Sequence, residues 1–146
     1  MRKVFLVLMM CGVMLVCGCQ KKNHDNELTT TGGEKGDNEI MVTCSSWSGW
    51  SEDYEPVEEI FLYPVEKGTM VKPTNKNIVG PFEFQITAVS PNSITIRTNQ
   101  CMSCKKVEEA GINLNSKEDT FEIKKGEAIK LTTLTTDCGD IYIIEY

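Results

Sequence analysis

The cysteines of this 146-residue chain could form disulfides, act as reactive thiols or bind a metal, and four of the seven lie after residue 40. They are Cys44, Cys101, Cys104 and Cys138. In an exported domain, an even number of cysteines favours two disulfides. Because long loops gain most from closure, we expect Cys101 and Cys104 to pair separately with Cys44 and Cys138. A local Cys101–Cys104 link, free thiols and a zinc site remain as alternatives.

The segment 101–105, CMSCK, has a C-x-x-C-K spacing that is similar to that of thioredoxin-like redox proteins. A short helix expected over residues 105–110 could lower a thiol pKa through its N-terminus. Thioredoxin-like folds also need a βαβ unit and a cis-proline, whereas no proline follows Pro91 and the C-terminal third alternates like a hairpin. A thiol redox or metal-handling role of Cys101 and Cys104 is therefore the alternative function.

Two tryptophans and a tyrosine, Trp47, Trp50 and Tyr54, lie close together in a stretch rich in glycine and serine. Tryptophan offers much contact area at low entropic cost, so we expect a binding loop for a sugar or a peptide. The alternative is that at least one of the tryptophans packs in the core.

Five carboxylates follow within eight residues. They are Glu52, Asp53, Glu55, Glu58 and Glu59. Such a group could bind Ca²⁺, which takes six to eight oxygen ligands, or face a basic partner. No D-x-D-x-D-G loop is present, so we expect a solvated acidic surface and no metal.

Other catalytic patterns are missing from the sequence. It contains no G-x-S-x-G, H-E-x-x-H, P-loop or G-x-G-x-x-G string, and its only histidine, His24, lies in a polar stretch. We therefore expect a protein that is not an enzyme and has no cofactor. The formal net charge is −6, with 15 basic and 21 acidic residues, which disfavours nucleic acid as a partner.

The N-terminus has the pattern of a secretory signal: Met1-Arg2-Lys3, then residues 4–19 without a charge. This run is shorter than the roughly 20 apolar residues of a membrane-spanning helix. It ends in Val16-Cys17-Gly18-Cys19, which resembles the lipobox of bacterial lipoproteins. The resemblance implies removal of residues 1–18, a diacylglycerol thioether on Cys19 and attachment to the extracytoplasmic face of a membrane. An ordinary signal peptide and a freely secreted protein are the alternative.

The mature chain divides into a tether over residues 19–39 and a folded body over residues 40–146. The tether is polar, with Leu28 as its one aliphatic residue, and cannot offset its ordering entropy. In the body, short alternating runs are separated by turn residues, which predicts one antiparallel β-sandwich of seven or eight strands. The expected strands are 40–44, 59–63, 69–72, 82–87, 94–98, 121–123, 128–135 and 141–144. Asp137 and Asp140 flank Gly139 and are expected in a turn.

Taken together, these patterns indicate a membrane-anchored lipoprotein that displays a small β-sandwich outside the cytoplasm. Its expected partners are the membrane, through the lipid on Cys19, and a protein or carbohydrate ligand.

Overall fold

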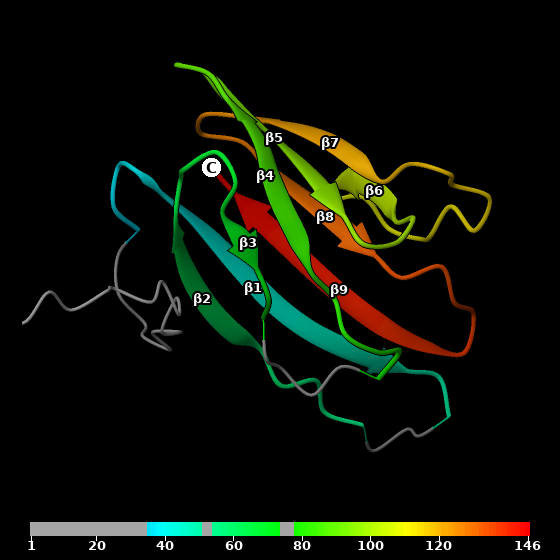
Figure 1. Ribbon diagram of the computed structural model, residues 1–146. Helices are drawn as coiled ribbons and strands as arrows, with labels where there is room; N and C mark the ends of the chain where they lie inside the picture. Colours follow the sequence, from blue (N-terminus) through cyan, green and yellow to red (C-terminus); the bar gives the residue numbers. More distant parts are fainter. Residues whose placement is uncertain (1–34, 51–53, 74–77) are drawn as a thin grey trace, which may run out of the picture.

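Nine β-strands in two antiparallel sheets make up the part of the chain that the computed structural model describes, residues 35–50, 54–73 and 78–146. The strands are β1 (Glu39–Ser48), β2 (Glu59–Pro64), β3 (Met70–Val71), β4 (Phe84–Val89), β5 (Ser93–Thr98), β6 (Ser103–Lys106), β7 (Thr120–Lys124), β8 (Ala128–Thr132) and β9 (Cys138–Glu145). Figure 1 shows the two sheets lying face to face. The predicted all-β sandwich is confirmed, with nine strands in the described residues rather than seven or eight.

The larger sheet has the order β2-β1-β9-β8-β6, which places β1 in its interior. Burial alternates along β1, where Ile40, Val42, Cys44 and Ser46 are buried and the residues between them are half-buried. Neighbouring residues of a strand point to opposite faces, so this alternation turns one face of β1 to the core.

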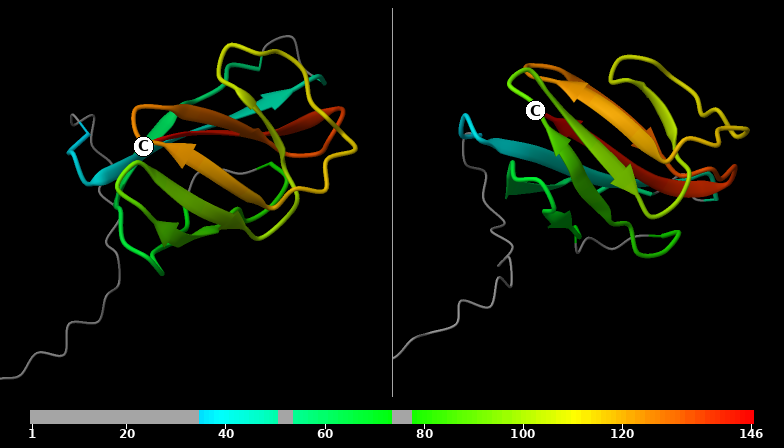
Figure 2. Two further views of the ribbon diagram at one scale, coloured as in Figure 1. Left: turned by 90° about the horizontal axis from the view of Figure 1, so that it is seen from above. Right: turned by 45° about the horizontal axis from the view of Figure 1, so that its top comes forward.

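The smaller sheet has the order β3-β4-β5-β7. The predicted hairpin is formed by β4 and β5, and Ser90 closes its turn by donating from the backbone N–H to the Ser93 carbonyl at 2.8 Å. The register shifts between Ile86 and Ala88, which is a β-bulge. Figure 2 shows this sheet from two further directions, with β4 and β5 side by side.

The core lies between the sheets, and a stacked pair of aromatic rings joins them. Phe82, just before β4, stacks on Tyr142 of β9 with ring centroids 3.8 Å apart. Phe82 also contacts Phe84, with ring centroids 5.8 Å apart. All three side chains are buried, and the contact fixes the smaller sheet over the middle of the larger one.

The short helix expected over residues 105–110 is absent, and that prediction was wrong. Ser103–Lys106 is strand β6, with Cys104 opposite Leu131 of β8, and a turn follows in which Glu109 N–H donates to the Lys106 carbonyl at 3.1 Å. Pairing with β8 supplies the hydrogen bonds that local sequence did not predict, and such tertiary pairing overrides local propensity.

Residues 35–39, at the end of the expected tether, make contacts with the folded body. Glu39 belongs to β1 and accepts a hydrogen bond from Gly36 N–H at 2.9 Å, and Lys35 forms an ion pair with Glu145 of β9 at 3.0 Å. The expected signal peptide, the lipid site at Cys19 and the tether up to residue 34 lie outside the described residues. Within those residues, no helix is long and apolar enough to span a membrane.

Candidate functional site

The aromatic stretch lies at the end of β1 opposite to the point where the chain enters the sandwich. A strand of ten residues spans roughly 30 Å, so Trp47 and Trp50 are far from Glu39. Trp50 is 78% exposed and Tyr54 36%, whereas Trp47 is half-buried on the outer face of β1. The predicted binding loop is therefore an exposed feature of one end of the molecule, with Trp50 as its most exposed aromatic side chain.

Trp47 packs on the sheet where the opposite strand has no side chain. It faces Gly139 of β9, and a Cβ atom on Gly139 would lie 2.8 Å from Trp47 Nε1. The same Cβ would lie 2.6 Å from Thr133 Oγ1 and 2.7 Å from Thr135 Oγ1. Only glycine leaves room for this approach, so the indole and the two threonines are held against the sheet surface.

The aromatic loop is tied to the connection between β8 and β9. Gly49 N–H donates to the Asp137 carbonyl at 2.6 Å, and Trp50 N–H donates to Ser48 Oγ at 3.2 Å. These bonds fix the backbone just before the exposed indole. The loop base is thus positioned, which reduces the ordering cost when a ligand binds.

A pocket of about 370 Å³ lies in the same region. It is lined by Leu114, Leu134, Thr135, Thr136, Asp137 and Cys138. Threonine hydroxyls and a carboxylate can hydrogen-bond a polar ligand, while the leucines offer apolar contact. Because the Asp137 carbonyl also accepts the hydrogen bond from Gly49, the pocket lies next to the base of the aromatic loop, and the two are considered together as the candidate site.

Asp140 was expected in a turn, and that prediction was wrong. It lies within β9, is fully buried, and accepts hydrogen bonds from Ser46 Oγ at 2.8 Å, Ile78 N–H at 2.9 Å and Val79 N–H at 3.0 Å. Three donors satisfy the buried carboxylate. Its role is structural, since it fastens residues 78–79 to the interior of the larger sheet.

The acidic residues do not form a metal site in the part of the chain that is described. Glu52 and Asp53 lie outside it, Glu55 and Glu58 are exposed, and Glu59 begins β2. No group of three or more histidine, cysteine or acidic side chains there has the arrangement to hold a metal ion.

The four cysteines of the body are free thiols in the structure, and the register separates Cys44 from Cys104 and Cys138. Cys44 and Cys104 lie in one row across β1, β9, β8 and β6, three strand spacings or about 14 Å apart. Cys138 lies opposite Ser48, four residues along β1 from Cys44, or about 13 Å. Disulfides need Cα atoms within about 7 Å, so Cys44 cannot pair with Cys104 or Cys138 in this arrangement. The expected disulfides are absent from the structure, in which Cys101 is also a free thiol.

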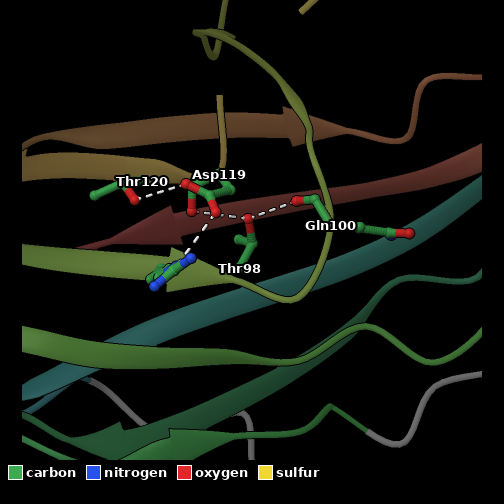
Figure 3. Close-up of polar contacts among 5 residues, drawn as sticks. Thr98, Gln100, Asp119 and Thr120 are labelled. Carbon is green, nitrogen blue, oxygen red and sulfur yellow. Dashed lines mark hydrogen bonds and ion pairs between the residues drawn. The ribbon is translucent and has the colours of Figure 1, made fainter. Parts of the chain in front are cut away.

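Cys101 and Cys104 lie at the far edge of the larger sheet, and a polar network fixes the chain just before them (Figure 3). The Thr98 hydroxyl donates to the Gln100 carbonyl at 2.7 Å and lies 3.1 Å from the Asp119 carbonyl. Arg97 and Thr120 bind the Asp119 carboxylate at 3.2 and 2.8 Å, and these contacts lower the pKa of that carboxyl group. Cys101, which follows this segment, is exposed.

The surroundings of Cys104 do not favour a reactive thiolate. Burial raises the pKa of its thiol, and the nearby Glu118 and Glu109 raise it further. The helix whose N-terminus could have lowered a thiol pKa is strand and turn instead. Although Cys104 lines a pocket of about 480 Å³ with lysines and glutamates, this environment keeps it protonated.

Comparison with known proteins adds no family. No family model matches the chain, and no curated protein or solved structure matches it either.

The sequence predicted the aromatic loop but not the residues at this end of β9 that contact distant segments. Gly139, Thr133 and Asp140 act through contacts with distant residues, and their local sequence is typical of a turn. In the sequence, these contacts are indicated only by the close spacing of small and polar residues around Gly139. That spacing does not reveal which strand Gly139, Thr133 and Asp140 face.

Proposed function

We propose that this protein is a lipid-anchored, extracytoplasmic binding module that presents Trp50 and the adjacent pocket to a carbohydrate ligand. The observation that carries the proposal is the 78% exposure of Trp50 beside a loop base fixed by the Gly49–Asp137 hydrogen bond. An exposed tryptophan leaves apolar surface in contact with water, which is unfavourable, and a ligand that covers the indole gains the free energy of burying that surface.

The mixture of apolar and polar side chains at the site supports a sugar as the ligand. Carbohydrates present apolar ring faces and many hydroxyls, which suit an exposed indole together with the pocket residues Thr135, Thr136 and Asp137. The acidic residues Glu55 and Glu58 on the same connection disfavour polyanions. None of these side chains forms an acid–base or nucleophile pair, so the proposed activity is binding without catalysis.

The geometry of β1 supports display away from a membrane. A lipid on Cys19 would pull on the chain at the Glu39 end of β1, and Trp50 lies beyond the other end. In this arrangement the tether and the strand together hold the site away from the bilayer surface.

The ligand is tested with immobilised oligosaccharides and isothermal titration of those that bind. We expect Trp50→Ala to weaken binding at least about fivefold, because one stacked aromatic contact is worth about 1–3 kcal/mol. Val57→Ala is the matched control, since Val57 is a 72% exposed apolar residue further along the same connection. Equal binding by wild type and Trp50→Ala, or binding of proteins but of no sugar, would contradict the carbohydrate proposal.

The anchor is tested separately by detergent partition. Wild-type protein should enter the detergent phase, while Cys19→Ala should stay in water because it lacks the thiol that carries the lipid. If Cys19→Ala sediments with membranes as fully as wild type, the lipobox interpretation is wrong.

A further inference from the structure

Strand β2 is an open edge of the larger sheet. In the described part of the chain it pairs with β1 alone, in a register that runs from Glu39 opposite Pro64 to Cys44 opposite Glu59. Figure 1 shows β2 at the outer margin of this sheet. An edge strand presents backbone N–H and C=O groups that can pair with another extended chain.

Of the four edge strands in the described residues, β2 is the least protected. Natural edges are protected by shortness, by lysine and by proline. β3 has two residues and is followed by Lys72, β6 contains Lys105 and Lys106, and β7 ends at Lys124. β2 is the longest of the four edges at six residues, contains no lysine, and carries proline only at its last position.

Both faces of β2 suit an added strand. Phe61 and Tyr63 are buried toward the core, while Ile60 and Leu62 are half-buried on the outer face. The outer row continues from Leu62 to Met41 of β1. An added strand could place alternate side chains beside Ile60 and Leu62 and so extend an apolar row that now ends at the edge.

Charge indicates the kind of chain that would pair there. No lysine or arginine occurs between residues 36 and 66, and Glu55, Glu58 and Glu59 lie just before or at the start of β2. A basic segment that pairs with β2 would lie close to these three carboxylates. A second copy of β2 would bring only further acids, so the charges favour a different partner.

We propose that the β2 edge binds an extended basic segment of a partner protein, which is added as a sixth strand to the larger sheet. This surface is separate from the Trp50 loop and its pocket, so the inference goes beyond the proposed carbohydrate binding and does not depend on it.

The test uses the full chain in detergent and a synthetic peptide that alternates lysine with valine. We expect saturable binding that weakens as salt is raised, with slower hydrogen exchange of β2 amides in the complex. A peptide with glutamate in place of lysine should bind at least tenfold more weakly. Trp50→Ala should bind the lysine peptide as wild type does, which separates this surface from the sugar site.

Two variants locate the surface. Leu62→Lys places a charge on the edge and should weaken peptide binding at least tenfold. Met41→Lys is the matched control, because it places the same charge in the same row on an interior strand, and should change binding less than threefold. The double variant Glu55→Gln/Glu58→Gln alters exposed residues only, and should weaken binding several-fold and reduce its salt dependence.

Several results would overturn the proposal. These are no binding at millimolar lysine peptide, equal binding of the glutamate peptide, or equal weakening by Met41→Lys and Leu62→Lys. Sedimentation that reveals a dimer lost in Leu62→Lys would assign the edge to a second copy, and would also overturn it.

Discussion

Replacement of Asp140 by alanine should destabilise the sandwich by about 2–4 kcal/mol. Hydrogen bonds to a charged group contribute about 1.5–3 kcal/mol each, and Asp140 accepts three. The full sum does not apply, because Ile78 and Val79 are exposed and their N–H groups can bind water once released. The buried Ser46 hydroxyl would lose its carboxylate acceptor, and this loss accounts for much of the remaining cost.

Urea unfolding followed by tryptophan fluorescence measures this loss, on protein made without residues 1–19. With a slope of about 1–3 kcal/mol per molar urea, a loss of about 3 kcal/mol lowers the midpoint by about 1–3 M at unchanged slope. Asp140→Asn keeps one acceptor oxygen but turns an amide toward a donor, so its midpoint should lie between those of alanine and wild type. Asp137→Ala is the control, because Asp137 is exposed in the adjacent loop and should cost less than about 0.5 kcal/mol. If Asp140→Ala unfolds at the midpoint of Asp137→Ala, the structural role of Asp140 is refuted.

Three further predictions concern the core and the thiols. Phe84→Ala should cost about 3–5 kcal/mol in the same urea assay, because it leaves a cavity between the sheets, and a cost below about 1 kcal/mol would place Phe84 outside the core. Tyr63→Phe should be neutral or stabilising at pH 7, since the Tyr63 hydroxyl is buried and has no hydrogen-bond partner among the described residues. Burial raises the pKa of Tyr63 in the folded state above its unfolded value of about 10. Above about pH 10 the unfolded chain loses the Tyr63 proton while the folded protein keeps it, so the free energy of unfolding falls as the pH rises. Tyr63→Phe lacks this proton and should lose less stability than wild type between about pH 10 and 12. Native protein should react with a thiol reagent at the exposed Cys101 and not at Cys44, whose pKa is raised by burial, and rapid native labelling of Cys44 would contradict its position in the core.

The sequence predicted the strands whose pattern is local and missed those that depend on a neighbour. Residues 94–98 and 121–123 alternate clearly between apolar and polar side chains, and both became strands close to the expected bounds. β6 has no such alternation, because Cys104, Lys105 and Lys106 follow one another at a sheet edge. Its strand geometry comes from pairing with β8, and only the fold brings the two together.

The same limit explains the cysteines. Loop-closure entropy ranks pairs by their separation in sequence, and on that basis alone Cys44 is a good partner for Cys101 or Cys104. The strand order excludes the pair with Cys104, because it inserts β9 and β8 between β1 and β6. An entropic preference acts only on pairs that the folded chain can bring within bonding distance.

Gly139 and Asp140 show how two adjacent residues organise opposite sides of one strand. Because side chains alternate along β9, the position of Gly139 opens the outer face, where Trp47 packs, while Asp140 points inward and holds residues 78–79. A glycine next to an aspartate is typical of a turn, and this local pattern led to the wrong prediction. In the strand, both residues are needed: Gly139 leaves room for Trp47, and the buried Asp140 carboxylate accepts hydrogen bonds from residues 78–79. The end of the sandwich that carries Trp50 is therefore shaped from both faces of β9, and a substitution at either position should disturb it.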